Sequence, residues 1–345
     1  MKAATYQGVG EVKVMDVPKP AIKRADEVLV RITLNAICGS DLHAYHGRIP
    51  MSEGELLGHE FVGVVEEAGS AVNRFKKGDR VVTSFYIACG HCALCRKGNF
   101  NECVNLETFG FGAVLGSLGG GQSEYVVVPL ADSSMELIPE EVSDEQAVFV
   151  GDILSTGLFA AERAEIRYGD TVAIIGAGPV GLMATMCAQL FGPARVFIVD
   201  VVDSRLELAQ ELGAIPINSS KLNPIEAILE RTGGVGADSS IEAVGATATV
   251  DMAIRCVRGG GTVSVVGVPA EFTADFPYYL FWEKALTFRS GRCNVQRYMR
   301  PLLDLIAAGR LHPEKIISHR MKLADAEEAY KMFDARKATK IVLTP

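Results

Sequence analysis

The spacing of apolar residues changes twice along the chain. From residue 1 to about 150, short β-branched runs are separated by Gly, Pro and Asp. Short strands between such turn signals are typical of a mostly antiparallel β domain. Four of these runs predict strands, at residues 28–34, 61–65, 80–83 and 125–128.

From about residue 153 to 291, predicted strands alternate with predicted helices. Residues 171–175 form a buried strand, followed by a Gly-rich turn and an apolar helix that ends at Gly192. Residues 195–200 form the next strand, and residues 204–212 an amphipathic helix. Further strands are expected near residues 239–244, 262–266 and 285–288. This alternation indicates βαβ units and a parallel sheet, and therefore an α/β fold.

The last stretch, from about residue 292, holds two helical segments at 297–308 and 324–335 and an apolar strand at 340–344. It is too short to form a domain alone, so we expect it to pack on the first one. The predicted domains are thus residues 1–152 with 292–345, and residues 153–291.

Composition narrows the classes of function. The chain has 345 residues, of which 48% are hydrophobic and 22% charged, as in an ordinary globular protein with two domains. The net charge of −8, with no strongly basic segment, argues against a nucleic-acid partner. No apolar run reaches the ~18 residues that span a bilayer, and the N-terminal residues lack the apolar core of a secretory signal. We therefore expect no membrane partner and a cytoplasmic location.

Four of the eight cysteines lie within fifteen residues. Two-residue spacers let their thiolates converge on one zinc ion, and four thiolates leave no open coordination position. A redox pair would sit at a helix N-terminus beside a βαβ strand, and a nucleic-acid zinc ribbon would need more positive charge. The sequence therefore predicts a structural zinc in a lobe at about residues 86–108, bound by Cys89, Cys92, Cys95 and Cys103.

The Gly-rich turn after the strand at 171–175 predicts a dinucleotide site. Gly176 permits the tight turn, Gly178 lets the pyrophosphate approach the backbone, and Gly181 allows close packing of the helix on the strand. The backbone of Pro179 and Val180 opens the helix, whose free N–H groups favour phosphate.

Asp200 ends the next strand, where an acid that binds the ribose hydroxyls is expected. A simple capping role is the alternative, but Asp203 and Ser204 are better placed to cap the following helix. A carboxylate would repel the 2′-phosphate of NADP, so we expect NAD, with Arg205 as the main reservation. Other expected cofactor contacts are Arg205 itself, Val244, Val266 and Gly267.

A second metal site is suggested by Cys38, His59 and a carboxylate, which would leave one zinc position open for substrate. Glu60 and Asp152 are the candidate carboxylates. From spacing alone this is only a suggestion, since an isolated Cys is usually a core residue and a lone His or Asp a satisfied polar group.

Together these motifs resemble the zinc-dependent alcohol dehydrogenases of the medium-chain dehydrogenase/reductase superfamily, over essentially the full chain. The matching segments, in order, are residues 38–43, 58–60, the four-cysteine lobe, the Gly-rich turn with Asp200, and the closing 340–343. The resemblance implies a GroES-like β-rich catalytic domain and a Rossmann domain. It also implies two zinc ions per chain, NAD, a small alcohol, aldehyde or ketone as substrate, and a homo-oligomer, either dimer or tetramer.

Carried onto this chain, Cys38 and His59 become ligands of the catalytic zinc, and Glu60 a carboxylate that can approach it. Asp152 stands where the branch typified by bacterial secondary alcohol dehydrogenases has its third ligand, whereas liver-type enzymes have cysteine. Adjacent side chains on a regular strand point to opposite faces, so tight binding by both His59 and Glu60 would be strained, unless a local turn or a mobile metal permits it. We therefore expect Asp152 to complete the resting site.

The resemblance also assigns the neighbouring polar residues. Asp41 would orient His59, and Ser40 and His43 would form a proton relay. Zinc would lower the pKa of the bound alcohol, and the substrate carbon would pass hydride to the nicotinamide.

Two alternatives stay open. A polyol or amino-alcohol dehydrogenase shares these motifs, and residues 47–49 are similar to sorbitol-type sequences, whereas residues 151–157 favour simple alcohols. A non-catalytic NAD- or zinc-binding protein would have lost ligand or relay residues, and none is lost. Three aromatic residues are candidates for an apolar substrate pocket, with a core role as the alternative: Phe109, Phe111 and Trp282.

Overall fold

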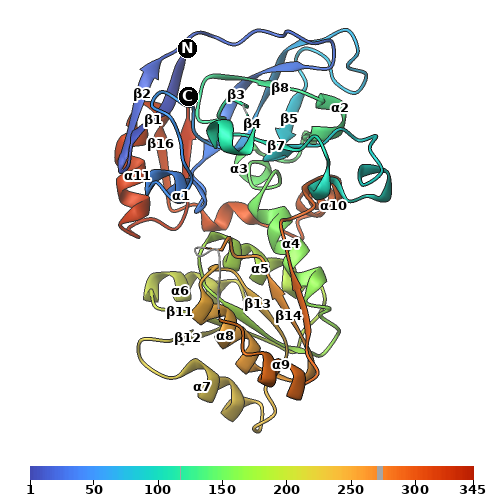
Figure 1. Ribbon diagram of the computed structural model, residues 1–345, viewed down its shortest axis with the longest axis vertical. Helices are drawn as coiled ribbons and strands as arrows, with labels where there is room; N and C mark the ends of the chain where they lie inside the picture. Colours follow the sequence, from blue (N-terminus) through green and yellow to red (C-terminus); the bar gives the residue numbers. More distant parts are fainter. Residues whose placement is uncertain (117, 270–274) are drawn as a thin grey trace. The chain divides into compact units, whose positions relative to one another are not determined.

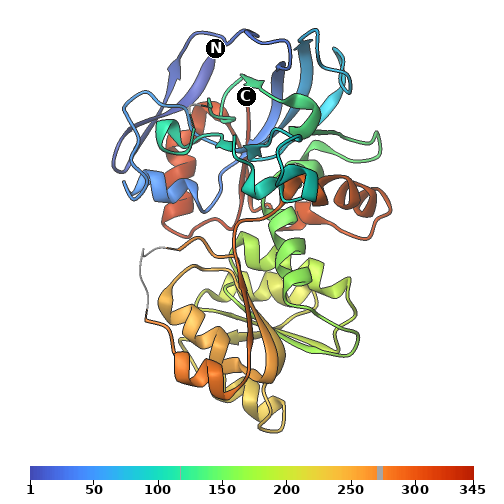
Figure 2. The same cartoon turned by 45° about the vertical axis from the view of Figure 1, so that its right-hand side comes forward.

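A computed structural model describes residues 1–116, 118–269 and 275–345 of the protein (Figure 1; Figure 2). Contacts within it divide the chain into two compact units. Unit 1 comprises Met1–Ser155 and Asn294–Pro345, and unit 2 comprises Thr156–Cys293.

Unit 1 is built on a seven-stranded sheet in which β3 pairs with β4, β8 and β17. All its described strand pairs are antiparallel except β16 with β17, which confirms the predicted mostly antiparallel sheet. The C-terminal strand β17 thus returns to the N-terminal sheet. The strands are β3 (Val28–Ala36), β4 (Glu60–Ala68), β5 (Arg80–Thr83), β8 (Tyr125–Val128), β9 (Met135–Leu137), β16 (His319–Lys322) and β17 (Ile341–Thr344).

A hairpin and several helices complete unit 1. The hairpin pairs β1 (Lys2–Gly8) with β2 (Glu11–Asp16), and α11 (Ala326–Asp334) packs beside it. Tyr45 and Tyr330 belong to the apolar core that joins these elements. The remaining helices are α1 (Asp41–Tyr45), α2 (Ala131–Ser134), α3 (Asp144–Ala147), α10 (Val295–Ala307) and α4 (Ile153–Arg163), which continues into unit 2.

The cysteine lobe begins and ends on a small ladder in which β6 (Tyr86–Ile87) pairs with β7 (Glu107–Thr108). Between these strands the described backbone forms two short 3₁₀ turns, Cys95–Lys97 and Phe100–Glu102. These turns contribute only Cys95 to the buried residues. The lobe therefore has little apolar core of its own, and a bound metal would supply what packing does not.

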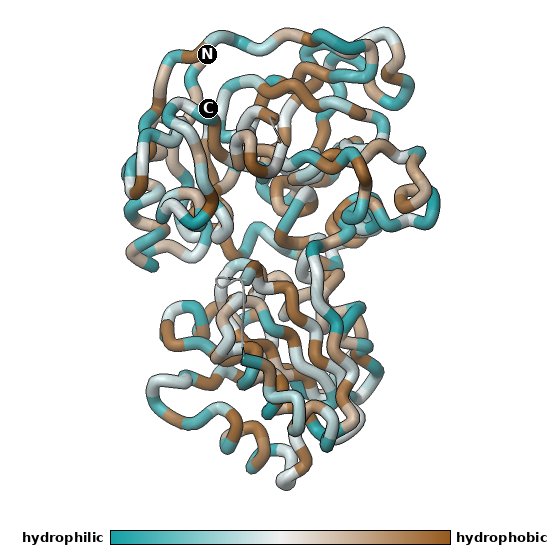
Figure 3. The backbone as a smooth tube through the Cα atoms, viewed as in Figure 1, coloured by the Kyte–Doolittle hydropathy of each residue, from teal (hydrophilic) through white to brown (hydrophobic). Residues whose placement is uncertain are grey.

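Unit 2 is a six-stranded parallel sheet in the order β12-β11-β10-β13-β14-β15. Many apolar segments, brown in Figure 3, lie in this unit, and strand β10 is buried at every residue, because parallel strands are covered on both faces. The strands are β10 (Thr171–Ile175), β11 (Arg195–Asp200), β12 (Ile215–Asn218), β13 (Ala237–Glu242), β14 (Val257–Val265) and β15 (Thr287–Ser290). The helices are α5 (Pro179–Gln189), α6 (Asp203–Glu211), α7 (Pro224–Arg231), α8 (Thr247–Cys256) and α9 (Tyr278–Glu283).

The strand order has one reversal that positions a ligand. From β10 the chain builds outward through β11 to β12, then returns to β13 on the other side of β10. The Gly-rich turn between β10 and α5 lies at this reversal, at the carboxyl end of β10. In open α/β sheets, ligands bind at this point.

Several element bounds of unit 2 differ from the sequence-based expectation, with β14 beginning at Val257 and β15 spanning Thr287–Ser290, and two of the differences have a local cause. Strand β13 ends at Glu242, two residues earlier than predicted, because the Glu242 side chain accepts hydrogen bonds from the turn that follows. The expected cap of α6 is also wrong: its N-cap residue is Val202, and no side chain caps it. Asp203 instead accepts a hydrogen bond from Asn218 and pairs with Lys221.

None of the helices in the described parts of the chain is long and apolar enough to cross a membrane.

Candidate active site and metal centres

Four potential metal donors meet inside unit 1. Cys38 follows β3, His59 and Glu60 stand at the start of β4, and Asp152 precedes α4. Their donor atoms all lie within 4.8 Å of one another, and the side chains are buried or nearly so. Three separate segments of the chain therefore converge on one point.

The distances among three of these donors fit a single zinc ion. Cys38 Sγ lies 3.4 Å from Asp152 Oδ2, and His59 Nε2 lies 3.2 Å from the same oxygen. Tetrahedral bonds of about 2.0–2.3 Å place ligand atoms roughly 3.3–3.7 Å apart. These three side chains can thus bind zinc with only small shifts.

Glu60 is bound by a buried lysine. Lys340 Nζ lies 2.8 Å and 2.7 Å from the two carboxylate oxygens of Glu60 and donates to the carbonyl oxygen of Ile37 at 2.8 Å. Lys340 is fully buried. Burial opposes its charge, but the attraction of Glu60 and Cys38 raises the pKa of Lys340 above its usual value. The ammonium group therefore holds the Glu60 carboxylate in place.

The backbone has the local turn that lets His59 and Glu60 approach the same point. His59 lies outside the regular strand, which begins at Glu60. Gly58 before it has φ +92°, a conformation that favours glycine. This turn lets adjacent side chains approach the same point.

Asp41, from the start of α1, faces the other side of the imidazole. Its Oδ1 lies 3.1 Å from His59 Nδ1, and its Oδ2 accepts the backbone N–H of Cys38 at 2.9 Å. Within the described residues, neither Asp41 Oδ1 nor His59 Nδ1 has any other partner. A proton on Nδ1 would satisfy both atoms and leave Nε2 free to bind a metal.

The chemistry of the donor set also suits a cation. Burial, followed by the charges of Asp152 and Glu60, raises the pKa of the Cys38 thiol to about 12. A thiol in these surroundings would ionise at neutral pH only beside a strong positive charge, as a divalent metal provides. The residues therefore fit the zinc that the resemblance implies.

Ser40 borders this group, and His43 follows it on α1. Ser40 Oγ lies 3.2 Å from Cys38 Sγ and 3.1 Å from His59 Nε2, so its hydroxyl is beside the donor atoms. His43 lies on α1, half-buried, with Arg48 Nη1 3.5 Å from its Nδ1. Burial, then the charges of Arg48 and His46, lowers the pKa of His43.

The three aromatic candidates have different environments. The Phe111 ring stacks on His59 with centroids 4.9 Å apart, so it is adjacent to the donor group. Phe109 is fully buried and packs edge-on against Phe61 in the core of the sheet. Trp282 lies on α9 in unit 2 and is 68% exposed. Of the three, only Phe111 borders the donor group within unit 1.

The four clustered cysteines form a second set of donors whose sulfur atoms lie within 4.8 Å of one another. Backbone N–H groups point at the sulfurs, as from Cys89 to Cys103 Sγ at 3.2 Å and from Cys92 to Cys89 Sγ at 3.3 Å. Hydrogen bonds from the backbone of Cys95 and Val104 lower the pKa of Cys92 to about 6. These N–H groups stabilise thiolate, the form that binds zinc.

The three glycines of the nucleotide turn differ in the space around them. Gly176 has φ +101°, and a Cβ there would lie 2.5 Å from Val244. A Cβ on Gly181 would lie 1.8 Å from the carbonyl oxygen of Gly176. Beside Gly178, by contrast, no atom of the described residues would lie within 4 Å. The turn is thus tightly packed at its first and third glycines and open at the second, before Pro179 and Val180 at the start of α5. This pattern fits a dinucleotide pyrophosphate.

Asp200 ends β11 and contacts this turn. Its Oδ2 accepts the N–H of Ala177 at 2.7 Å, and its Oδ1 accepts those of Val201 and Val202 at 2.7 Å and 2.9 Å. The carboxylate therefore both organises the turns and stands beside the Gly-rich segment. Arg205 follows, half-buried, in the first turn of α6.

The remaining expected cofactor contacts follow β13 and β14. Val244 is 49% exposed, and its N–H donates to Glu242 Oε1 at 2.8 Å. The N–H groups of Val266 and Gly267 donate to the carbonyl oxygen of Glu242. Glu242 thus joins the ends of both strands, and the only sequence signal for it was an acid near the end of a predicted strand. A hollow of about 520 Å³ in unit 2 is lined by residues 246–248, 251 and 275–277.

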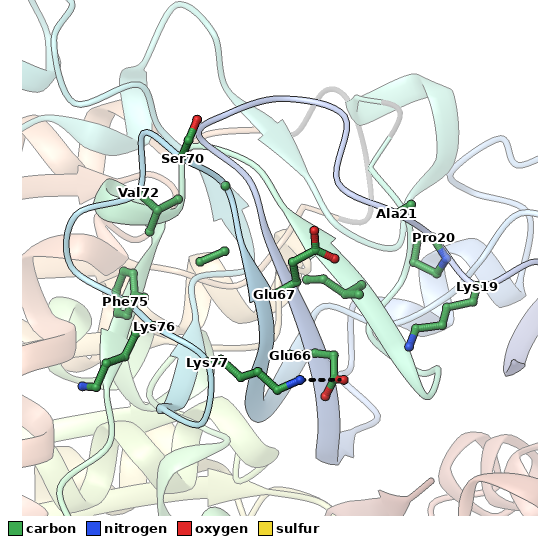
Figure 4. Close-up of a pocket in the computed structure, with 13 residues that line it drawn as sticks. Lys19, Pro20, Ala21, Glu66, Glu67, Ser70, Val72, Phe75, Lys76 and Lys77 are labelled. Atoms are coloured by element: carbon green, nitrogen blue, oxygen red, sulfur yellow. Dashed lines mark hydrogen bonds and ion pairs between the residues drawn. The ribbon is translucent and has the colours of Figure 1, made fainter.

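A larger groove of about 910 Å³ lies elsewhere in unit 1 (Figure 4). It is lined by residues 19–21 and by the end of β4 with the turn after it, and Lys77 pairs with Glu66 across it at 3.4 Å. None of the predicted site residues lines this groove, so size alone does not identify the site.

Comparisons with known proteins agree with this geometry. The family model of the alcohol dehydrogenase GroES-like domain matches residues 24–139, and that of the zinc-binding dehydrogenases matches residues 179–308. These matches confirm the expected combination of GroES-like and Rossmann folds.

Full-length relatives extend the match. A probable zinc-binding alcohol dehydrogenase of Mycobacterium tuberculosis is 41% identical, over 99% of this chain and 87% of its own. An uncharacterised zinc-type alcohol dehydrogenase-like protein of Bacillus subtilis is 36% identical over the whole of both chains. The solved structure of an alcohol dehydrogenase from Thermus sp. ATN1 superposes with a TM-score of 0.96 at 43% identity, covering 100% of this chain and 99% of the other. The chain belongs to the zinc-dependent alcohol dehydrogenases of the medium-chain dehydrogenase/reductase superfamily.

Proposed function

We propose that this enzyme transfers hydride between a primary or secondary alcohol and NAD, giving an aldehyde or ketone. The observation that carries the proposal is the convergence of Cys38, His59 and Asp152 with zinc-ligand spacing, with Ser40 beside them. Three protein ligands leave a fourth position for a substrate oxygen. When bound, zinc acts as a Lewis acid on that oxygen, and the nicotinamide accepts the hydride.

The side chains around the donors handle the proton. Ser40 Oγ, next to His59 Nε2, is positioned to accept the proton of the substrate hydroxyl while its own proton would pass to a ribose hydroxyl of the bound nicotinamide. His43, whose lowered pKa keeps it neutral near pH 7, would accept the proton released by that ribose hydroxyl and return it to water. Phe111, stacked on His59, supplies an apolar wall.

We propose that Asp152, not Glu60, is the third resting ligand. Asp152 Oδ2 is 3.2–3.4 Å from the other two donors, whereas both oxygens of Glu60 face Lys340. Asp152→Ala should therefore lose most of its active-site zinc and turnover. Glu60→Ala should keep zinc and slow turnover, and zinc content with X-ray absorption of the metal measures both. Full occupancy and unchanged coordination in Asp152→Ala would refute the assignment.

Asp200 is proposed as the residue that selects NAD over NADP. Its carboxylate borders the Gly-rich turn through Ala177, so a 2′-phosphate there would meet a fixed negative charge. Asp200→Gly should raise kcat/KM with NADP relative to NAD. Asp200→Glu, which keeps the charge, serves as the control. A native enzyme that already prefers NADP would contradict this role.

The other cofactor and metal residues follow from their positions. We assign Gly176, Gly178, Pro179, Val180 and Gly181 to the pyrophosphate, and the loops that carry Val244, Val266 and Gly267 to the nicotinamide side. Arg205 is assigned to the adenosine side. The structural zinc is assigned to Cys89, Cys92, Cys95 and Cys103, which would fix the lobe.

Assembly and location are further parts of the proposal. The edge strand β15 and the exposed rings of Tyr279 and Trp282 on α9 offer a surface for a second copy, so we propose a dimer or tetramer. Light scattering measures this. We also propose a cytoplasmic location, because a cluster of four cysteines that binds zinc as thiolates suits a reducing compartment.

A panel of alcohols tests the function. Primary, secondary and polyhydroxy alcohols are each incubated with the zinc-loaded enzyme and NAD while NADH formation is followed. The proposal expects turnover of simple primary or secondary alcohols and its loss in Cys38→Ser. Turnover restricted to polyols or amino alcohols would favour the rival specificity, and no turnover of any alcohol or carbonyl would favour a non-catalytic NAD- and zinc-binding protein.

A further inference from the structure

A buried chain of hydrogen bonds lies behind Asp41, on the side away from the metal donors. Tyr330 Oη donates to Gln122 Oε1 at 2.8 Å, and Gln122 Nε2 donates to Asp41 Oδ2 at 3.1 Å. Gln122 Nε2 also donates to the carbonyl oxygen of Ala36 at 3.3 Å. Tyr330, Gln122 and Asp41 are each fully buried.

The three residues come from distant parts of the chain. Tyr330 lies on α11, Gln122 precedes β8, and Asp41 begins α1, so the links span 208 and 81 residues. Buried polar side chains cost free energy unless their partners are provided. A chain assembled across such distances in the core therefore has a defined geometry that packing alone does not require.

The acceptors around the Gln122 amide set the direction of the protons in this chain. The Asp41 carboxylate and the Ala36 carbonyl oxygen both need a donor, so the amide presents its nitrogen to them and its oxygen to Tyr330. Burial holds the pKa of Tyr330 well above its usual value, so its hydroxyl keeps the proton that it donates. With the amide reversed, its oxygen would face the Asp41 carboxylate and the Ala36 carbonyl, two acceptors without a proton.

This orientation determines what Asp41 offers to His59. Oδ2 already receives two donors, the N–H of Cys38 and the amide of Gln122. Oδ1, 3.1 Å from His59 Nδ1, remains as the acceptor for the imidazole. A carboxylate held in this way keeps the proton on Nδ1 and the lone pair on Nε2, the nitrogen nearest Asp152.

We propose that Tyr330 and Gln122 are positioning residues that act through Asp41 to hold His59 as a strong Nε2 ligand of the active-site zinc. The inference rests on the proposed role of His59 as a ligand. It adds that the C-terminal helix α11 sets how tightly this metal is bound.

A purely structural role makes a different prediction. The Gln122 side chain also fills space beside Gly58, where an added Cβ would lie 2.4 Å from Gln122 Cγ. If packing were its only contribution, an apolar residue of similar size would preserve the zinc site. Melting temperature alone therefore cannot separate the two roles, and the metal itself must be observed.

The test uses the zinc-loaded enzyme and three variants. Gln122→Leu and Tyr330→Phe remove the hydrogen bonds with little change of shape. Tyr45→Phe is the matched control. Tyr45 packs against Tyr330 with ring centroids 5.7 Å apart but is not part of the hydrogen-bond chain from Tyr330 to Asp41. Release of zinc to a chromogenic chelator is timed, and the visible spectrum of the cobalt-substituted proteins reports the ligand geometry.

Loss of a partner around a metal-bound histidine commonly weakens metal binding about 10–100-fold. We expect Gln122→Leu to release the labile zinc about 10-fold faster and to shift the cobalt spectrum. Tyr330→Phe should release this zinc severalfold faster than the native enzyme. This second variant still tests the proposal if Gln122→Leu does not fold. Tyr45→Phe should match the native enzyme.

Two results would overturn the inference in distinguishable ways. If both Gln122→Leu and Tyr330→Phe release zinc at the native rate and keep the native cobalt spectrum, Gln122 and Tyr330 contribute only packing. The proposed zinc ligands would be unaffected by that result. Retention of the labile zinc in His59→Ala would instead remove the proposed ligand, and the inference with it.

Discussion

His43 is a residue whose chemistry is set by the charges around it. It is half-buried on α1 beside Arg48, and burial, Arg48 and His46 together lower its pKa. A base that stays neutral near pH 7 can accept a proton during turnover. In the unfolded chain the pKa of a histidine is about 6.5, above that of His43 in the folded protein. As pH falls below about 6.5, the unfolded chain therefore binds more protons at this residue, and the free energy of unfolding decreases.

Removing the Arg48 charge tests this electrostatic control. In Arg48→Ala the pKa of His43 should rise toward about 6.5, because a repelling charge is lost. The acidic limb of kcat/KM should then move to higher pH, and the acid loss of stability attributable to His43 should shrink. NMR titration of the imidazole and a pH–rate profile measure the two effects. Arg48→Lys keeps the charge and should leave both unchanged; equal shifts in the two variants would exclude an electrostatic cause.

Some site residues could be predicted from sequence because their partners are close along the chain. Cys89 to Cys103 lie in one loop, and Gly176 to Gly181 in one turn. By contrast, Lys340 meets Glu60 across 280 residues, and Tyr330 meets Gln122 across 208. Such partners are set by tertiary packing. The only local signal for Lys340 was a charged residue at the start of an apolar strand.

Among the elements, strand β10, the Gly-rich turn and helix α5 pack so closely that individual backbone atoms limit the residues allowed. A Cβ on Gly181, for example, would lie 1.8 Å from the carbonyl oxygen of Gly176. Strand β10 was predicted at its observed bounds because five buried apolar or small residues precede glycine. Element ends set by side-chain contacts were less predictable. The shift of β13 follows from Glu242, and the start of α6 follows from Asp203 bonding to Asn218 rather than to its own helix.

Substitution by alanine should affect different properties at the two glycines of this turn, Gly181 and Gly178. In Gly181→Ala the methyl group meets the Gly176 carbonyl oxygen, so helix and strand must separate at a cost of about 1–3 kcal/mol. In Gly178→Ala the methyl group enters open space, so stability should change less while the KM for NAD rises. Thermal unfolding without cofactor and NAD kinetics separate the effects. An unaltered KM in a folded Gly178→Ala would argue against pyrophosphate at this position.

At the scale of the whole molecule, the two donor sets differ in how they are built. One is local, with four thiols from a single loop whose backbone N–H groups favour thiolate. The other set joins segments up to 114 residues apart. Of its four donors, Glu60 is held by the ion pair with Lys340, which leaves Cys38, His59 and Asp152 to bind the metal. Four ligands close a zinc site, whereas three leave a position that water, substrate or a chelator can enter.

The enzyme should therefore hold two zinc ions of unequal lability. Mild chelation should remove about one zinc per chain together with all activity, because a chelator can attack the open site through its fourth position. The circular dichroism spectrum should stay unchanged at this stage, because the cysteine lobe keeps its own zinc. On further acidification, protons should compete with zinc for the four cysteine sulfurs, and release of the second zinc should then lower the melting temperature. Timed metal analysis with parallel activity and melting curves follows both steps. Fully active protein with a single zinc per chain would disprove the two-site arrangement.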